Sequence, residues 1–267
     1  MMKALVIVLA GLAALTAAVR VLQPRFAFFP LHGEDATPSS IGIAFQAATI
    51  ATGDREQLRA WFLPHEPARA LVVYFHGNGG NLSDWLPILA GIHRAGFSVA
   101  AIDYRGYGLS TGSPSEQGLY RDVDAALEWA VPLRPQGVPL VFWGRSLGTT
   151  MAAYAATHTH PQGVILESGF PDLGSVVQSS WPLRFLSLFS SYRFPTAQYA
   201  RQAGCPVLVM HGDADHVIPV SAGRALYEGL PDPKRFEVIP GADHNDAVPP
   251  DPQRYWRAVE EFVRGLR

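Results

Sequence analysis

From about residue 41 onward, short apolar runs alternate with longer stretches whose apolar residues recur at helical spacing. Several short runs are continuously apolar, which is typical of strands buried on both faces of a parallel sheet. They predict strands at Ile43–Ile50, Leu58–Leu63, Ala70–Phe75, Ser98–Asp103, Leu140–Trp143, Val164–Glu167, Val207–Met210 and Phe236–Ile239. The longer stretches predict helices at Ser83–Ala95, Ser115–Ala130, Leu147–Thr157, Ser221–Gly229 and Gln253–Arg264. Two strands followed by repeated strand–helix units predict an α/β fold, with a mostly parallel sheet of about eight strands and helices on both faces.

A different pattern occupies the N-terminus, where Ala4–Val19 is an unbroken apolar run that ends before Arg20. As a helix this run would span about 24 Å, at about 1.5 Å per residue, against a hydrocarbon core of roughly 30 Å. Continuation to Leu22, with the Arg20 side chain reaching the interface, nearly closes that gap. We therefore expect residues 1–22 to be a membrane anchor or a signal sequence, separate from a domain formed by residues 23–267.

Two interpretations of the apolar run remain open. The aromatic and basic segment Arg25–Phe29 suits a membrane interface beside an uncleaved single anchor. The small residues Thr16–Ala18 instead offer a cleavage site, after which the protein would be exported. A core helix is disfavoured because it should carry a polar face. The charges on the two sides of the run balance, so the membrane face of the domain stays undetermined.

Residues 170–199 depart from the alternation of strands and helices, since they are rich in aromatic and aliphatic residues and poor in charge. Such a segment is either a buried pair of helices or a small lid that forms the wall of an acyl pocket. Both interpretations stay open.

The amino-acid composition excludes several classes to which the protein could belong. The chain has 48% hydrophobic and 16% charged residues, which indicates a folded globular protein. With 21 Lys and Arg residues against 23 Asp and Glu residues, there is no basic excess to bind a phosphate backbone. We therefore expect no nucleic-acid partner. A single cysteine, Cys205, excludes an internal disulfide and a cysteine-rich metal site.

The sequence Gly144–Gly148 fits the pattern G-x-S-x-G. A predicted strand precedes it, and a helix-compatible stretch rich in alanine follows it. This strand–turn–helix arrangement holds a serine on a strained turn with its hydroxyl exposed, and a Cβ in place of either glycine would collide with the neighbouring elements. We therefore predict that Ser146 is a nucleophile.

A serine hydroxyl needs a base and an orienting carboxylate, which should follow it in the order acid and then histidine, each in a loop after a later strand. His244 lies in the loop after the last predicted strand. Asp213 and Asp215 compete for the role of the acid in the loop before it. Asp215 is preferred, because Asp213 directly follows the glycine at the strand end and is placed to cap the turn.

An oxyanion needs two preorganised donors. We expect them to be the backbone N–H groups of Leu147 and of Asn78, with Gly79 as the substitute for Asn78. The loop that holds Asn78 is rich in glycine, but it lacks both the Lys-Ser/Thr ending of a P-loop and the dinucleotide spacing. No helical pair of histidines accompanies His211–His216. We therefore predict neither a metal nor a cofactor.

At these motifs the chain resembles the α/β-hydrolase superfamily, from about Ile41 to the C-terminus. Asp103–Ser110 and Gly112–Glu116 resemble a membrane-anchored branch that includes eukaryotic protein depalmitoylases and many bacterial esterase-like proteins. The resemblance implies an α/β-hydrolase fold, a triad of Ser146, Asp215 and His244, and an N-terminal anchor. The chain lacks the N-terminal cysteine cluster of the depalmitoylases, so a protein-depalmitoylating role does not carry over.

We therefore expect a serine hydrolase that cleaves small-molecule acyl esters or thioesters through an acyl-enzyme. The first alternative is a peptidase of the same fold, for which we find neither an extra domain nor a charge clamp. The second is a binding protein without catalytic activity, which would have no need of a complete triad.

Overall fold

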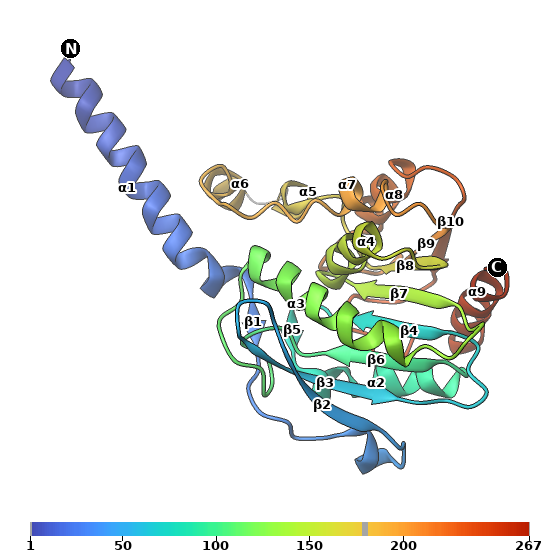
Figure 1. Cartoon of the computed structure of the whole chain (residues 1–267). Coiled ribbons are helices and arrows are strands. Elements are labelled where there is room, and N and C mark those ends of the chain that lie inside the picture. Colours follow the sequence, from blue (N-terminus) through green and yellow to red (C-terminus); the bar gives the residue numbers. More distant parts are fainter. Residues whose placement is uncertain (1, 178–180, 267) are drawn as a thin grey trace.

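The computed structural model describes residues 2–177 and 181–266 (Figure 1). Its main sheet has eight strands in the order β10-β9-β8-β7-β4-β6-β3-β2. The pairings are parallel except where β3 meets β2 and β6, which confirms the mostly parallel sheet. The strands are β2 (Gln46–Ala51), β3 (Gln57–Leu63), β4 (Leu71–Phe75), β6 (Ser98–Ile102), β7 (Leu140–Arg145), β8 (Gly163–Glu167), β9 (Val207–Gly212) and β10 (Lys234–Ile239).

Helices cover both faces of this sheet, and each face has its own apolar core. On one face α3 (Glu116–Ala130), α4 (Gly148–His158) and α8 (Val220–Glu228) pack against one side of the strands. On the other face α2 (Leu82–Arg94) and α9 (Pro252–Arg264) pack against the alternate strand residues. Because side chains alternate between the faces of a strand, continuously apolar strands can fill both cores.

Two of the expected helices start at or close to capping residues. The side chain of Ser115 accepts the Gly118 N–H and caps α3, and Asp251 caps α9, directly before Pro252. The largest difference from an expected strand boundary is in β2, which begins at Gln46 rather than Ile43. The residues before it form a short 3₁₀ helix, η1 (Pro38–Ile41), which ends at Gly42 with a left-handed φ of 77°.

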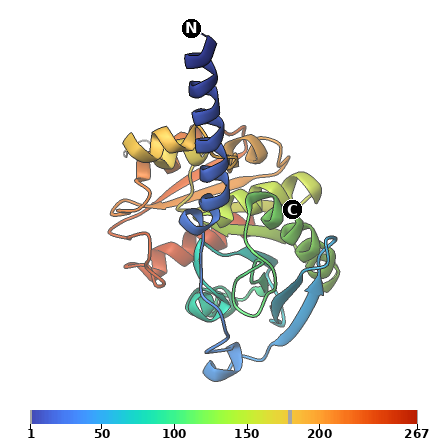
Figure 2. The same cartoon turned by 90° about the vertical axis from the view of Figure 1, so that its left-hand side faces the viewer.

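The N-terminal apolar run forms the helix α1 (Met2–Ala27), which projects from the domain in Figures 1 and 2. None of its residues is buried, so the interpretation as a core helix was wrong. Its 26 residues have a mean hydropathy of 2.4 in the most apolar window, which suffices by length and composition to cross a membrane. The helix continues beyond Leu22, the end expected from the sequence, and includes Pro24.

A connecting segment, residues 23–33, comprises the last residues of α1 and the chain that leads from it into the domain. Its strand β1 (Phe29–Pro30) pairs in parallel with β5 (Gly79–Gly80), a two-stranded sheet that the apolar pattern did not predict. Phe28 is buried and lies edge-on to Tyr192 and Phe194. The connecting segment is therefore attached to the domain through Phe28 and β1.

The expected segment 170–199 forms α5 (Leu173–Val177), α6 (Trp181–Ser187) and the start of α7 (Thr196–Ala200), and residues 178–180 lie outside the described residues. The interpretation as a buried helix pair was wrong for α6. Trp181 is 77% exposed, and Leu188, just after the helix, is 73% exposed. Two serines after α6 bond to the end of α1, because Ser190 Oγ and the Ser191 N–H both donate to the side-chain oxygen of Gln23.

Candidate active site

Ser146 stands on a strained turn between β7 and α4. Its φ of 53° lies in the left-handed region, which non-glycine residues rarely adopt. Tight packing around the turn excludes side chains at both flanking glycines. A Cβ on Gly144 would collide with the carbonyl of Gly148, and one on Gly148 would collide with the carbonyl of Phe75 in β4. The turn therefore presents the serine hydroxyl beyond the carboxyl end of β7.

Loops after β9 and β10 bring an acid and a histidine to this hydroxyl. His244 Nε2 lies 3.0 Å from Ser146 Oγ, and His244 Nδ1 lies 2.7 Å from Asp215 Oδ2. The competing acid, Asp213, points elsewhere, because its Oδ1 accepts the Gly241 N–H at 2.6 Å. The hydroxyl, imidazole and carboxylate therefore form one continuous chain of hydrogen bonds, the geometry in which a histidine accepts a proton from a serine.

Asp215 is held as a carboxylate by its surroundings. Its Oδ1 accepts the N–H groups of Val217 at 3.0 Å and Ile218 at 2.7 Å. Burial alone would raise its pKa, but hydrogen bonds from His211, His244 and the Ile218 N–H outweigh burial and hold the pKa well below its ordinary value. An ionised Asp215 can stabilise a positively charged imidazole at His244.

Two other buried histidines, His76 and His211, support loops. His211 Nε2 lies 2.8 Å from the Ile218 carbonyl oxygen and 3.3 Å from Asp215, so this side chain braces the acid loop. His76 Nδ1 lies 2.7 Å from the Gly77 carbonyl oxygen. Burial lowers the pKa of His76 to about 4, so it stays neutral at physiological pH. Neither ring contacts the serine hydroxyl.

The two expected oxyanion donors, Leu147 and Asn78, line the same cavity as Ser146 and His244. Neither backbone N–H has a hydrogen-bond acceptor among the residues that the structure describes. The side chain of Asn78 is engaged elsewhere, because its Nδ2 donates to the Ala27 carbonyl oxygen at 2.7 Å. The last turn of α1 thus holds the loop that carries one expected donor.

The cavity beside Ser146 has a volume of about 740 Å³, within the range of small-molecule sites. Its lining includes the connecting segment, the loop after β4, the start of α2 and α5. The turn that holds Ser146 (the elbow, residues 144–148), the acid loop after β9 and the histidine loop (residues 240–247) complete most of the rest. Within residues 2–177 and 181–266, no group of three or more His, Cys, Asp or Glu side chains is arranged to hold a metal ion.

Arg145, the residue before the serine, is hydrogen-bonded to the main chain of the histidine loop. Its Nη2 donates to the carbonyl oxygens of His244 and Asp246, each at 2.8 Å. Burial alone would lower the pKa of Arg145, but the Glu167 carboxylate, 3.8 Å from Nη1, outweighs it and raises the pKa. Glu167 in turn accepts the Trp143 indole N–H and the Tyr255 hydroxyl, each at 3.0 Å.

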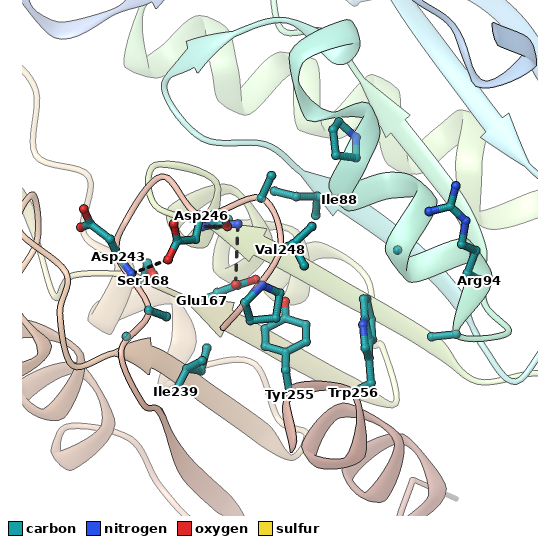
Figure 3. Close-up of a pocket in the computed structure, with 18 of the residues that line it drawn as sticks. Ile88, Arg94, Glu167, Ser168, Ile239, Asp243, Asp246, Val248, Tyr255 and Trp256 are labelled. Atoms are coloured by element: carbon teal, nitrogen blue, oxygen red, sulfur yellow. Dashed lines mark hydrogen bonds and ion pairs between the residues drawn. The ribbon is translucent and has the colours of Figure 1, made fainter. Parts of the chain in front are cut away.

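This buried pair borders a second cavity of about 390 Å³, shown in Figure 3 with Glu167 below Asp246 and Tyr255 reaching up from α9. Asp246 also accepts the Asp243 N–H at 2.8 Å, and Asp243 accepts the His244 N–H at 2.7 Å. The position of the histidine main chain is therefore fixed from both sides.

A family whose sequence model is described as "Serine aminopeptidase, S33" matches residues 66–203. That range includes Asn78, Ser146 and Leu147, whereas Asp215 and His244 follow it.

Curated relatives share most of the chain. An uncharacterized protein of Mycobacterium tuberculosis is 33% identical over 252 residues, which cover 90% of this chain and 87% of the relative. An uncharacterized membrane protein of Saccharomyces cerevisiae is 32% identical over 252 residues, covering 91% of this chain and 88% of the relative. An uncharacterized protein of Escherichia coli is 33% identical over 212 residues, covering 76% and 74%.

Solved structures of esterases share the architecture. An esterase of Pyrococcus furiosus has a TM-score of 0.72 at 17% identity, covering 90% of this chain and 98% of its own. An esterase from a Rhodococcus species has a TM-score of 0.63 at 20% identity, covering 83% and 99%. At identities this low, structural similarity shows the fold alone. It confirms the α/β-hydrolase fold that the motifs predicted.

Proposed function

Since the chain belongs to the α/β-hydrolase family described as serine aminopeptidase S33, we propose that it is a serine hydrolase that cleaves acyl esters or thioesters. Ser146, His244 and Asp215 form its catalytic triad, and the backbone N–H groups of Leu147 and Asn78 form its oxyanion hole. The observation that carries the proposal is the hydrogen-bond chain of 3.0 Å and 2.7 Å through His244.

The reaction runs in two halves. Ser146 Oγ attacks the acyl carbon while His244 Nε2 accepts the hydroxyl proton, and Asp215 stabilises the imidazolium. The two N–H groups bind the oxyanion, which collapses as His244 gives its proton to the leaving alcohol or thiol. A water molecule, deprotonated by His244, then attacks the acyl-enzyme. The proton returns to Ser146 Oγ, and the carboxylic acid is released.

The family description names an aminopeptidase activity. The residues that line the cavity support that activity less well than ester hydrolysis. Such an enzyme needs a free acidic group to bind the α-ammonium of its substrate. Among the described residues that line the cavity, the carboxylate is that of Asp84. It accepts the Asn81 N–H at 2.9 Å and so completes the capping box at the start of α2.

A membrane setting also belongs to the proposal. Residues 2–22 of α1 would anchor the protein, and residues 23–267 would form the catalytic domain, in which the segment 170–199 serves as a lid. The relative from Saccharomyces cerevisiae is named as a membrane protein. Cleavage near Thr16–Ala18, followed by export, is the competing outcome.

A substrate panel tests the proposal against the peptidase alternative. The full chain, purified in detergent, would be assayed on p-nitrophenyl esters from acetyl to palmitoyl and on p-nitroanilides of single amino acids. We expect ester hydrolysis, with kcat/KM for the anilides at least about 100-fold lower, because the one carboxylate that the described residues bring to the cavity, that of Asp84, is already hydrogen-bonded to the main chain. Anilide hydrolysis that exceeds ester hydrolysis would identify a peptidase instead.

Arg145→Lys should lower kcat for esters about 10-fold to 100-fold and leave KM within about twofold of wild type. Lysine keeps the charge, but one ammonium group cannot lie both beside Glu167, as Nη1 does, and between the two loop carbonyls, as Nη2 does. The exposed Arg254, which pairs with Glu237 at 3.1 Å, provides the control Arg254→Lys. An unchanged kcat in Arg145→Lys would show that the arginine does not position His244.

A further inference from the structure

The connecting segment contributes side chains to the cavity beside Ser146. Phe26, Phe29 and Leu31 of this segment line the cavity. Three residues of α5 line it as well: Leu173, Val176 and Val177. All six are apolar, and the two groups lie about 140 residues apart in the chain. The cavity thus has two apolar walls. One is formed by the connecting segment at the C-terminal end of α1, and the other by the segment expected to be a lid.

The wall formed by the connecting segment is open to solvent. Phe26 is 75% exposed, Phe29 is 59% exposed and Leu31 is 55% exposed. Large apolar side chains gathered at a concave surface are typical of binding sites for apolar groups, because a ligand removes their surface from water. The exposed fractions therefore indicate an apolar occupant.

Backbone and side-chain contacts fix this wall relative to the catalytic groups. Phe29 pairs with Gly79 in the β1–β5 sheet, next to the expected oxyanion donor. The Ala27 carbonyl accepts the Asn78 side chain at 2.7 Å, and the Tyr107 hydroxyl donates to the Asn78 carbonyl at 2.8 Å. The apolar wall therefore keeps a constant position relative to an acyl carbon bound at Ser146.

Charge around the cavity favours the same occupant. Its charged residues away from His244 are Asp84 and Arg145, and both are engaged with protein groups. The other lining side chains are mostly apolar, which suits an alkyl chain.

We propose that these six residues form a subsite for a medium or long acyl chain, whose carbonyl is bound at Ser146. The inference rests on the proposed ester hydrolysis and names its substrate class. The subsite lies at the root of α1, as Figures 1 and 2 show for the connecting segment, so it faces the side from which a membrane lipid would arrive.

Aspartate substitutions on the two walls test the subsite. In Phe29→Asp and Val177→Asp, a carboxylate would face the alkyl chain and lose water on substrate binding. We expect kcat/KM for p-nitrophenyl decanoate to fall about 10-fold to 100-fold in each variant, with p-nitrophenyl acetate within about threefold of wild type. The matched control is Leu109→Asp, since Leu109 is 55% exposed and lies outside the cavity lining.

The acetate ester separates this inference from the proposed function. A selective loss on decanoate in both wall variants, absent from the control, supports the subsite. Acetate hydrolysis by wild type with an unchanged decanoate-to-acetate ratio in the variants overturns the subsite and leaves ester hydrolysis standing. Wild type that hydrolyses neither ester, although folded by circular dichroism, overturns both.

Discussion

Replacing Ser146 with alanine should lower kcat/KM for acyl esters by about 10⁴-fold or more. Alanine removes the attacking oxygen but keeps the Cβ, so the left-handed turn with its φ of 53° faces no new steric demand. The variant should therefore fold normally and bind substrate while failing to form an acyl-enzyme. Initial rates on p-nitrophenyl esters, with the full chain in detergent, measure the effect.

Ser168→Ala is the matched control, because Ser168 also follows a central strand, has a φ of 50° and is buried. It lies outside the lining of the cavity beside Ser146, so its loss should change the rate less than about threefold. A Ser146→Ala protein that keeps more than about one tenth of the wild-type rate would contradict the assignment of Ser146 as the nucleophile.

Gly148→Ala should destabilise the fold by more than about 4 kcal/mol, or prevent folding altogether. The new Cβ would collide with the carbonyl oxygen of Phe75 and approach that of His76 to 2.7 Å. Both are main-chain atoms at the end of a central strand, which cannot move aside as the end of a flexible side chain can. Urea unfolding of the full chain in detergent, followed by tryptophan fluorescence, measures the loss.

Gly53→Ala provides the comparison, because a Cβ at Gly53 would meet no atom within 4 Å. Its unfolding midpoint should stay close to that of wild type, with a change in stability of about 0.5 kcal/mol or less. A Gly148→Ala protein that unfolds at the wild-type urea concentration would show that the elbow is looser than the described contacts require.

The sequence predicted the elbow because its evidence is local. A strand, a tight turn flanked by Gly144 and Gly148, and a helix follow one another within about 20 residues, and each has its own signature. The positions of Asp215 and His244 followed from the order of later strands, since carboxyl ends of parallel strands meet at one edge of a sheet. The choice of Asp215 over Asp213 rested on loop position, and the structure brings Asp215 to the histidine.

The supports of the site could not be predicted in this way, because they join residues far apart in the chain. Arg145 contacts the carbonyl of His244, 99 residues away, and Asn78 contacts the carbonyl of Ala27, 51 residues away. Main-chain carbonyls carry no sequence signal, since every residue has one. Only the fold determines which carbonyl a side chain meets.

The segment 170–199 and the end of α1 show a second limit of prediction from the sequence. Apolar residues there fit a core as well as an exposed surface, so composition left two interpretations open. Phe194 is buried while Trp181 is 77% exposed, although both belong to the same aromatic stretch. The β1–β5 pair also escaped prediction, because two residues per strand are too few to show alternation.

The most direct test of the triad is covalent labelling of the full chain with a fluorophosphonate, followed by peptide mass spectrometry. A phosphonate forms a stable adduct with a serine that a neighbouring base activates and an oxyanion hole assists. The account predicts one adduct, on Ser146, that disappears in His244→Ala at matched protein concentration. An adduct on a different residue, or esterase activity that persists with Ser146 unlabelled, would contradict it.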